Sequence, residues 1–564
     1  MPDIKDVILS NDYWDLIYPV WNTPERMLEN TELFPQIINH NFTQVFWNRN
    51  EPLDPSIREI LYSFLPNVYT LEDTTSVAKS GVLQVQSNPA LGLTGRNVLI
   101  GFLDTGIAYT HPAFQDAAGN TRIDFIWDQT IQTGPPPSGF NYGTEYSRSQ
   151  IQEAIDSPDP YQIVPSRDMD GHGTSLAGIA AGSVDEKNSF QGVAPDARLV
   201  VVKLKEAKPH LLEYYQFNGS SPMFQENDIL MAIRYLMETA RNLAMPLVIC
   251  ICLGTNQGAH TGDGALAGTL ESLKVYQGIS VVIAGGNEAG RAHHFSGRVT
   301  NPSVFEEAEI QVPANSPGFS MEFWGHPPDL YTVGIVSPLG EVVDRIPARF
   351  NQNQEISFIL ENTSLLISYG LVDTESGGQV IFFRFRQPTE GIWRIRIYCN
   401  TQPTGNFHLW LPADGMVDPD ITFLNPDPFT TIVAPGNAVP VITTAAYQAP
   451  NDSLYPYSSR GFTPIHDIKP DITAPGVDLT VPRPQGGYGA ATGSSIAAAF
   501  TAGSAALIVQ WGISREPKRY FSSNQIKSYL VRGAVRNPAL TYPNREWGYG
   551  ILNVYQVFSI FLSP

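Results

Sequence analysis

Continuous apolar runs alternate with amphipathic segments between about residue 94 and residue 302. The runs are rich in Val, Ile and Leu, a pattern typical of strands that are buried on both faces of a parallel sheet. Between them, apolar positions recur with helical spacing. This alternation predicts an α/β core in which helices flank a parallel sheet, with ligand sites beyond the carboxyl ends of the strands. The predicted strands lie at 97–104, 197–205, 246–254 and 279–284, and the predicted helices at 226–243 and 265–277.

Two further regions have different patterns. The first 75 residues alternate predicted strands, at 12–21 and 38–47, with predicted helices, at 23–34 and 54–65, which suits a small α+β domain. Residues 303–412 contain only short strands with turn signals between them, which predicts an inserted all-β sandwich or jelly roll. The predicted segments are an N-terminal domain (1–75), an α/β domain in two parts (76–302 and 436–564) and a β domain inserted between those parts (303–435).

The composition argues against some functions. The chain has 564 residues, of which 42% are hydrophobic and 16% charged, as expected of a well-packed globular protein. Its formal net charge of −20 argues against nucleic acid or an anionic membrane as a partner. The N-terminus lacks the basic and apolar regions of a secretory signal, and no apolar run approaches the roughly 20 residues that span a bilayer, so we expect no membrane span.

The three cysteines do not form a metal-ligand pattern. Cys250, Cys252 and Cys399 are few and have no metal-ligand spacing. We interpret them as buried thiols in a reducing compartment. No acidic loop has the spacing of a recognised calcium motif. The sequence therefore assigns no metal and no cofactor.

Three short motifs together indicate nucleophilic catalysis. Asp104 ends a predicted strand, His172 precedes a helix of small residues, and Ser494 and Ser495 begin another such helix. Each motif alone is weak, because turns and helix caps use the same residues. A serine hydroxyl, however, needs a base within hydrogen-bond reach and an acid that orients the base. The chain supplies these groups in the order Asp, His, Ser, and the motifs alone do not decide between the two serines.

A fourth motif supplies an oxyanion donor. Asn287 follows a predicted buried strand and two glycines, in VVIAGGNEAG. Its side-chain amide can donate to a tetrahedral oxyanion, and the backbone N–H of Ser495 at a helix N-terminus is a second donor. The alternative is a turn residue that tolerates a left-handed conformation.

These motifs resemble the subtilisin-type serine endopeptidases. The resemblance rests on FLDTG, DGHGTSLAGIAAG, VVIAGGNEAG and GSSIAAAFTAG, and it covers most of residues 93–302 and 436–556. It implies that Asp104 orients His172, that His172 acts as general base and then acid, and that Ser495 is the nucleophile, because Ser494 stands where the family usually has Thr. The chain departs from the family pattern at Ala499, where Pro is usual.

The same resemblance implies a substrate cleft. Leu253 and Gly254 are expected to line it and to pair with a peptide backbone, and Ala284 and Gly285 to form a wall of the S1 pocket. Subtilisin-like enzymes often bind calcium, but no residues here can be assigned to it. The expected substrate is a protein or peptide, and the expected protein is a monomer.

With its β insertion and without a signal, the chain most resembles the clostridial spore germination proteases of the Csp group. That resemblance implies that residues 1–75 are a prodomain, a folding chaperone and inhibitor that stays bound after self-cleavage near Thr74–Ser76. It further implies an intracellular or spore-associated protease that activates a cortex-lytic proenzyme.

Two other functions are possible from the sequence. The chain could be a catalytically silent scaffold or signalling protein whose cleft is blocked by the prodomain. An esterase would require a Gly-x-Ser-x-Gly motif and the order Ser, acid, His, and the chain has neither.

Overall fold

The computed structural model describes residues 3–20, 33–52, 61–71, 80–87, 91–348, 353–400 and 404–562. Its centre is a nine-stranded sheet in the order β25-β24-β12-β10-β5-β8-β6-β7, with β26 paired to β24. All pairs in this sheet are parallel except β24 with β25 and β6 with β7. The strands are β5 (Leu99–Asp104), β6 (Ile123–Asp128), β7 (Thr144–Ser147), β8 (Arg198–Lys203), β10 (Leu247–Ile251), β12 (Ile279–Ala284), β24 (Ile442–Gln448), β25 (Ser453–Leu454) and β26 (Ile472–Pro475).

Helices flank this sheet on both faces. Alternate residues of β5 belong to two separate cores: Ile100 and Phe102 pack in one, and Leu99 and Leu103 in the other. Burial on both faces explains why the strands appear in the sequence as uninterrupted apolar runs. The helices of the described chain are α1 (Ile4–Leu9), α4 (Val82–Ser87), α5 (Arg148–Asp156), α6 (Pro160–Ile163), α7 (His172–Ala181), α8 (Pro209–Tyr215), α9 (Glu226–Asn242), α10 (Ala265–Ser272), α11 (Ser494–Ile513), α12 (Ser523–Arg532) and α13 (Val554–Leu562).

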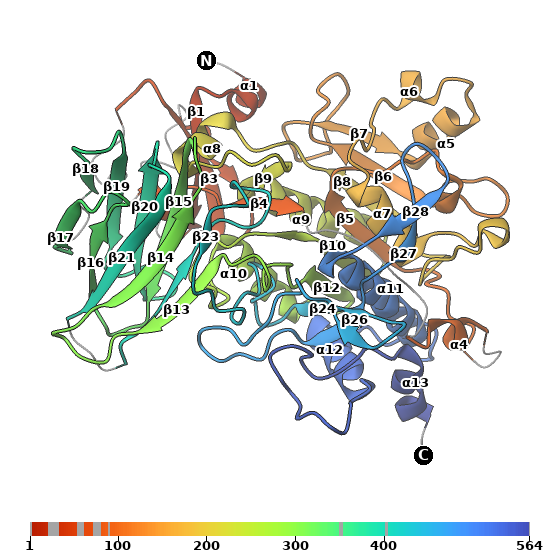
Figure 1. Cartoon of the computed structure of the whole chain (residues 1–564). Coiled ribbons are helices and arrows are strands. Elements are labelled where there is room, and N and C mark those ends of the chain that lie inside the picture. The colour runs from red at the N-terminus through yellow and green to blue at the C-terminus, as the bar shows by residue number, and fades with distance from the viewer. Residues whose placement is uncertain are drawn as a thin grey trace.

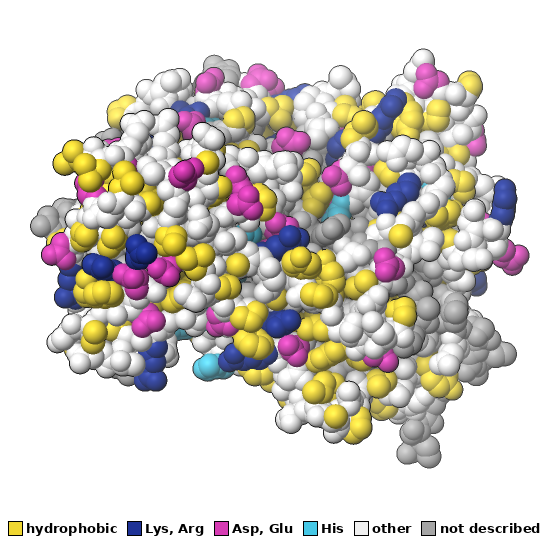
Figure 2. All heavy atoms as spheres, in the orientation of Figure 1, with side chains coloured by type: hydrophobic (Ala, Val, Ile, Leu, Met, Phe, Trp, Pro, Cys, Tyr) yellow, Lys and Arg dark blue, Asp and Glu magenta, His cyan; other side chains and the backbone are white. Residues whose placement is uncertain are grey.

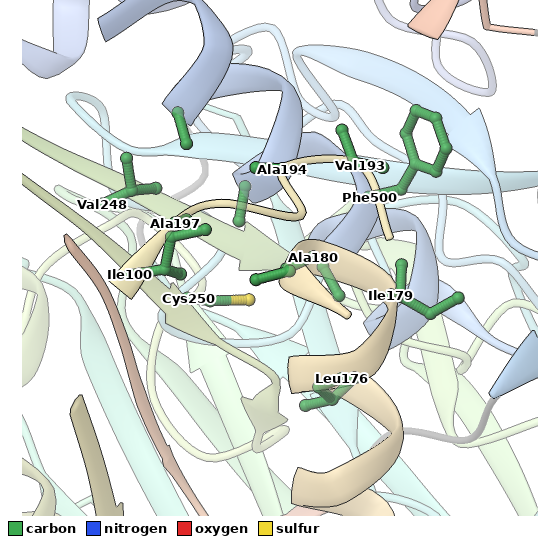
Figure 3. Packing of buried hydrophobic residues seen from close by; sticks show 14 of the residues in the cluster. Ile100, Leu176, Ile179, Ala180, Val193, Ala194, Ala197, Val248, Cys250 and Phe500 are labelled. Carbon is green, nitrogen blue, oxygen red and sulfur yellow. The ribbon is translucent and has the colours of Figure 1, made fainter. Parts of the chain in front are cut away.

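Small residues let α7 and α11 pack closely within the core that contains Ile100 and Phe102 (Figure 3). At Gly503 on α11, an added Cβ would lie 2.6 Å from the Cβ of Val193 and 2.7 Å from the carbonyl oxygen of Ala180 on α7. Among the described helices, α11 is the one whose length and apolarity would allow it to cross a membrane, and 83% of that apolar window is buried inside the protein. Its apolar residues therefore serve the core.

Two antiparallel sheets form the inserted β sandwich. One has the order β13-β22-β15-β20-β19-β18 and the other β17-β16-β21-β14-β23, and their inner faces enclose a third core. Figure 1 shows the sandwich, in green, beside the α/β domain. The strands are β13 (His294–Arg298), β14 (Glu306–Val312), β15 (Gly318–Gly325), β16 (Tyr331–Val336), β17 (Val342–Ile346), β18 (Asn353–Ser357), β19 (Ser364–Gly370), β20 (Gln379–Arg386), β21 (Gly391–Cys399), β22 (Asn406–Trp410) and β23 (Thr422–Phe423).

The first strand of the sandwich starts before the predicted boundary at 303. β13 begins at His294 and pairs with β22 along its whole length. Its sequence, HFSGR, is too short and polar to give a strand signal, so the pairing with a distant strand decides its structure. The three predicted boundaries between the segments themselves stay predictions.

The N-terminal region forms a small sheet and contributes one strand to a second sheet. β1 (Tyr13–Pro19), β3 (Phe42–Asn48) and β2 (Gln36–Ile37) form the small sheet, which packs against α8 and β20. β4 (Val68–Leu71) lies instead between β11 (Leu253–Gly254) and β9 (Met223–Gln225). The predicted helices at 23–34 and 54–65 lie mostly outside the described residues, which include the short 3₁₀ turn Leu61–Ser63.

A short β-hairpin directly precedes α11. β27 (Leu479–Pro482) pairs with β28 (Tyr488–Ala491) beside α7.

The surface in Figure 2 carries acidic side chains scattered among basic and apolar ones, without one dominant charged patch. The acidic side chains are therefore spread out on this face.

Histidine rings stack on Trp410 where the sandwich meets the α/β domain. The ring centroids of His260, His294 and His408 lie 4.1, 5.0 and 5.0 Å from that of Trp410. The Nε2 atom of His294 is 3.0 Å from Nδ1 of His408. Burial lowers the pKa of all three histidines, and it lowers that of His294 to about 3. These rings are therefore neutral in the folded protein near neutral pH.

We predict that acid weakens this junction. Unfolded histidines titrate near pH 6.5, so the stabilisation is fully present above about pH 6.5 and is lost as the pH falls toward the folded pKa. For His294 the loss at pH 5 is about 2 kcal/mol. The unfolding temperature, followed by circular dichroism, should fall between pH 7 and pH 5, and His294→Gln should reduce that fall. His40→Gln, at an exposed histidine, should leave it unchanged; equal pH dependence in wild type and His294→Gln would contradict the prediction.

Candidate active site

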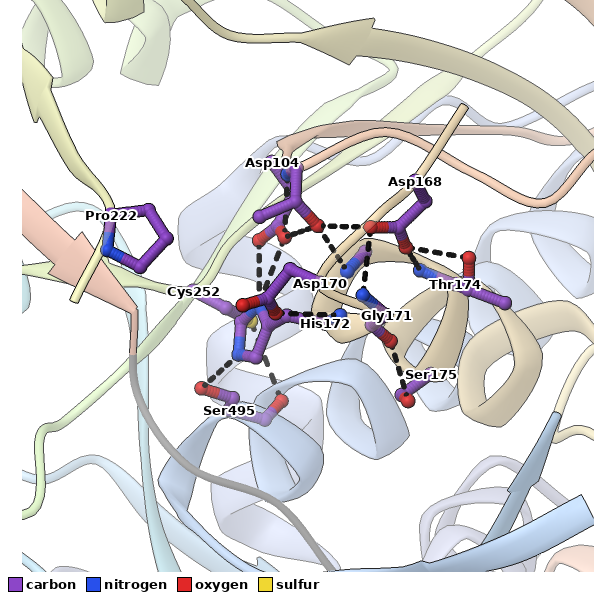
Figure 4. A network of polar contacts seen from close by, with 12 residues as sticks. Asp104, Asp168, Asp170, Gly171, His172, Thr174, Ser175, Pro222, Cys252 and Ser495 are labelled. Atoms are coloured by element: carbon purple, nitrogen blue, oxygen red, sulfur yellow. Dashed lines mark hydrogen bonds and ion pairs between the residues drawn. The ribbon is translucent and has the colours of Figure 1, made fainter. Parts of the chain in front are cut away.

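A carboxylate and an imidazole meet at the carboxyl end of β5. Asp104 is the last residue of that strand and is 1% exposed. Nδ1 of His172, the first residue of α7, lies 2.8 Å from Oδ1 and 2.9 Å from Oδ2 of Asp104 (Figure 4). The backbone N–H of Thr105 donates to Oδ1 at 2.8 Å. This arrangement fixes the ring plane and favours the tautomer that carries its proton on Nδ1.

The other ring nitrogen faces Ser495. Nε2 of His172 is 3.3 Å from Oγ of Ser495, which is the second residue of α11 and fully buried. The hydroxyl of Ser494 is used elsewhere, because its Oγ accepts from the backbone N–H of Gly286 at 3.1 Å. The structure thus brings Ser495, and not Ser494, to the imidazole.

Glycine at 173 allows α7 to approach the acid. A Cβ at this position would collide with the carbonyl oxygen of Gly106 and would lie 3.2 Å from Oδ1 of Asp104. Gly171, just before α7, has a φ of 96°, a conformation that other residues rarely adopt. Both glycines are therefore needed to present His172 to Asp104.

Asn287 lies beside the start of α11. It follows β12, is 5% exposed, and its Oδ1 accepts from the backbone N–H of Ser494 at 3.0 Å. This bond fixes the orientation of the amide, so that Nδ2 is the group that donates. The structure therefore brings four of the predicted residues, Asp104, His172, Ser495 and Asn287, into one place.

Asp168 is a residue of this network that the sequence analysis missed. Its Oδ1 accepts from Thr105 Oγ1 and from the Gly171 N–H, both at 2.8 Å. Its Oδ2 accepts from the N–H and the hydroxyl of Thr174 at 2.9 and 2.6 Å. A carboxylate at the start of a helix stabilises the unpaired N–H groups there. The available signal was an acidic residue four positions before His172, which alone does not show what it contacts.

A buried thiol touches the backbone of Ser495. Sγ of Cys252 donates to the carbonyl oxygen of Ser495 at 3.4 Å, and it lies 3.6 Å from Sγ of Cys250. All three cysteines are buried and unbridged, as the sequence analysis expected. Cys252 thereby links the end of β10 to the first turn of α11.

The predicted cleft residues already pair with a strand of this chain. Leu253 is opposite Leu71 and Gly254 is opposite Thr70, in antiparallel register. On its other edge, β4 pairs antiparallel with β9, with Thr70 opposite Met223. β4 is thus an extended segment between two strands of the α/β domain. Its Leu71 pairs with Leu253, the residue that follows Cys252.

Ala284 and Gly285 are placed at the end of β12. Ala284 is fully buried. The N–H of Gly285 donates to the Thr444 carbonyl at 2.9 Å, and its carbonyl accepts from Val433 at 3.1 Å. Both backbone groups of Gly285 are therefore bonded to neighbouring segments of the chain, and a role in the S1 wall stays a prediction.

In the described part of the chain, no group of three or more His, Cys, Asp or Glu side chains could hold a metal ion.

Comparison with known proteins gives relatives along most of the chain. A model described as "Subtilase family" matches residues 95–359 and 404–550. The Minor extracellular protease Vpr of Bacillus subtilis is 22% identical over 84% of this chain, and the Subtilisin-like protease SBT3.17 of Arabidopsis thaliana is 26% identical over 84%. This chain covers 53% and 62% of their lengths, so it spans little more than half of these curated relatives.

A solved structure is similar to nearly the whole fold. The CspB protease of Clostridium perfringens superimposes with a TM-score of 0.76 and 29% identity over 86% of this chain and 98% of the other. This similarity confirms the predicted likeness to Csp-type proteases. The family model covers well over half of the chain and includes Asp104, His172, Asn287 and Ser495. The chain belongs to the subtilase family of subtilisin-like serine proteases.

Proposed function

We propose that this chain is an active, self-processing endopeptidase that uses Asp104, His172 and Ser495. The observation that carries the proposal is the continuous contact from the Asp104 carboxylate through both ring nitrogens of His172 to the Ser495 hydroxyl. A subtilase that had lost activity would not need to retain this buried arrangement, because a buried carboxylate and imidazole cost stability unless they are paired.

The geometry supports acyl transfer. Oγ of Ser495 attacks the peptide carbonyl while its proton moves to Nε2 of His172. The oxyanion accepts hydrogen bonds from Nδ2 of Asn287 and from the Ser495 backbone N–H, at the positive end of α11. His172 then gives the proton to the leaving amine, which leaves an acyl-enzyme. Water, deprotonated by His172, hydrolyses the ester and restores the Ser495 hydroxyl.

The N-terminal strand supports the role of an internal inhibitor. β4 occupies the expected position of a substrate backbone, a mode of recognition that adds a strand between two sheet edges. The N–H of Val68 donates to Oε1 of Gln257 at 2.8 Å. The buried Glu226 accepts from the Asn67 N–H at 3.2 Å and from the Tyr69 hydroxyl at 3.4 Å. Side chains of the α/β domain therefore hold the strand in addition to the ladder.

The position of Leu71 supports cleavage shortly after β4. Leu71 is opposite Leu253, which follows Cys252, and Cys252 contacts Ser495. We therefore propose that the chain is cut in the residues that follow Leu71, and that the N-terminal region stays bound. The predicted junction, Thr74–Ser76, lies outside the described residues.

The likeness to the CspB protease motivates a narrower role. We propose limited proteolysis of a cortex-lytic proenzyme by an intracellular or spore-associated monomer. The second candidate is a silent scaffold, which is favoured by the strand that occupies the cleft. Cleavage of such a proenzyme by the purified chain, but not by its Ser495→Ala variant, would separate these two.

We predict that a fluorophosphonate probe labels Ser495. Mass spectrometry of the wild-type protein should show one adduct at this residue, and a cut between roughly residues 70 and 95. Ser495→Ala should lose both, because it lacks the nucleophile. Ser494→Ala is the matched control; it should still be labelled, since its hydroxyl contacts Gly286 and not His172. An adduct on Ser494, or a wild-type chain that is neither labelled nor cut, would contradict the assignment.

We predict that weakening β4 exposes the cleft. Thr70→Pro removes a backbone N–H from the middle of the three-stranded sheet, and proline is poorly tolerated in a central strand. The rate at which the probe labels Ser495 should rise by about tenfold, which corresponds to a loss of about 1.4 kcal/mol in docking. Thr70→Ser keeps the N–H and should label at the wild-type rate. A Thr70→Pro protein that is folded but labelled no faster would show that β4 does not block the site.

A further inference from the structure

Glu288, the residue directly after Asn287, has a buried carboxylate that the reaction scheme does not use. It is 3% exposed. Its Oε2 accepts from Nδ1 of His293 at 2.8 Å and from Nδ2 of Asn256 at 3.0 Å. Its Oε1 accepts from the backbone N–H of Asp414 at 2.9 Å. Three separate segments of chain therefore converge on one side chain.

Two of these segments belong to the β sandwich. His293 immediately precedes β13, its first strand, and Asp414 lies between its strands β22 and β23. The Leu411 N–H donates to the His293 carbonyl at 2.9 Å, so these two segments are also bonded to each other. Asn256, which follows β11, donates through Nδ2 to the Leu411 carbonyl at 3.1 Å as well as to Glu288.

The electrostatics favour an ionised Glu288. Burial alone would raise its pKa, but the electrostatic interaction with His293 and the hydrogen bonds from His293, Asp414 and Asn256 outweigh burial and lower the pKa. A buried carboxylate is stable only while such partners are in place. The position of Glu288 is thus fixed by His293 and Asp414 of the sandwich and by Asn256, which follows β11.

The neighbouring backbone transmits this position to Asn287. The N–H of Glu288 donates to Oγ of Ser459 at 2.9 Å, and Gly286 donates to Oγ of Ser494 at 3.1 Å. At Gly286, whose φ is 105°, an added Cβ would lie 2.7 Å from both Ser459 and Val433, so the turn has little space to move. Asn287 lies between these two anchored residues.

We propose that Glu288 is a positioning residue that couples the β sandwich to Asn287, so that the insertion is part of the support of the oxyanion site. This inference rests on the proposed use of Asn287 as an oxyanion donor. It gives the sandwich a function in the chemistry, because a donor must be held within about 0.5 Å of its productive position to be effective.

The test is a double-mutant cycle on the full-length protein with the fluorophosphonate probe. Glu288→Gln keeps the size of the side chain but replaces one acceptor oxygen by an NH₂ group, which faces the donors of His293 and Asn256. We expect its maximal phosphonylation rate to fall by about 10- to 100-fold, with the probe concentration for half-maximal rate nearly unchanged. Asn287→Ala alone should lose about 100- to 1000-fold. In the Asn287→Ala protein, adding Glu288→Gln should cost less than about twofold, because non-additivity marks residues that act through each other.

Asp124→Asn is the matched control. Like Glu288, Asp124 is a buried carboxylate. Its partner is Arg198, and it lies near the amino end of β6, away from the site. It should lower the unfolding temperature without changing the labelling rate. His293→Gln, which removes a partner of Glu288, should lower the maximal rate as Glu288→Gln does.

Three outcomes would overturn the inference. A Glu288→Gln protein that is labelled at the wild-type rate shows that Glu288 does not position the site. Additive losses in the cycle show that Glu288 acts through stability and not through Asn287. A wild-type protein that is not labelled at all removes the reaction itself, and with it both the proposed function and the positioning role.

Discussion

The close packing of α7 against α11 is the constraint on which this site depends. His172 is the first residue of one helix and Ser495 the second residue of the other, so the packing of the two helices sets the distance from His172 to Ser495. Gly503 allows this approach, because an added Cβ there would lie 2.7 Å from the carbonyl oxygen of Ala180. A larger residue at Gly503 would push the two helices apart, and with them His172 and Ser495. The alanine-rich sequence of α11 is therefore a packing requirement and a catalytic one together.

The acid is brought to this pair by the central sheet. β5 is flanked by β10 and β8, and Asp104 stands at its carboxyl end, where α7 begins. Gly173 and Gly171 remove the steric obstacles between the two elements. Asp168 then fixes Thr105 and the first turn of α7 together through four hydrogen bonds. The geometry of the site is thus a consequence of sheet order and helix packing.

Much of the fold and of the candidate site could be predicted from the sequence. The apolar runs predict the parallel strands because both faces of the sheet are buried, and the motifs around Asp104, His172, Asn287 and Ser495 carry a family resemblance that the comparisons confirm. The motifs alone did not decide between Ser494 and Ser495, the family resemblance implied Ser495, and the positions of the two hydroxyl groups agree with Ser495. β13, the pairing of β4 with β11, and the contacts of Asp168 and Glu288 could not be predicted, because each depends on residues far apart in the sequence. Such contacts arise from tertiary packing, for which local pattern gives no signal.

All three parts of the chain meet near Ser495. The α/β domain supplies the candidate catalytic residues, the N-terminal strand β4 pairs with Leu253 and Gly254, and two segments of the β sandwich bind Glu288, next to Asn287. The most direct measurement of this account is a crystal structure of the phosphonylated protein. The account predicts a phosphonyl group on Oγ of Ser495 whose oxygen accepts from Nδ2 of Asn287 and from the Ser495 N–H, with Glu288 still bonded to His293 and Asp414. A phosphonyl oxygen that points away from Asn287, or an adduct on a different side chain, would contradict it.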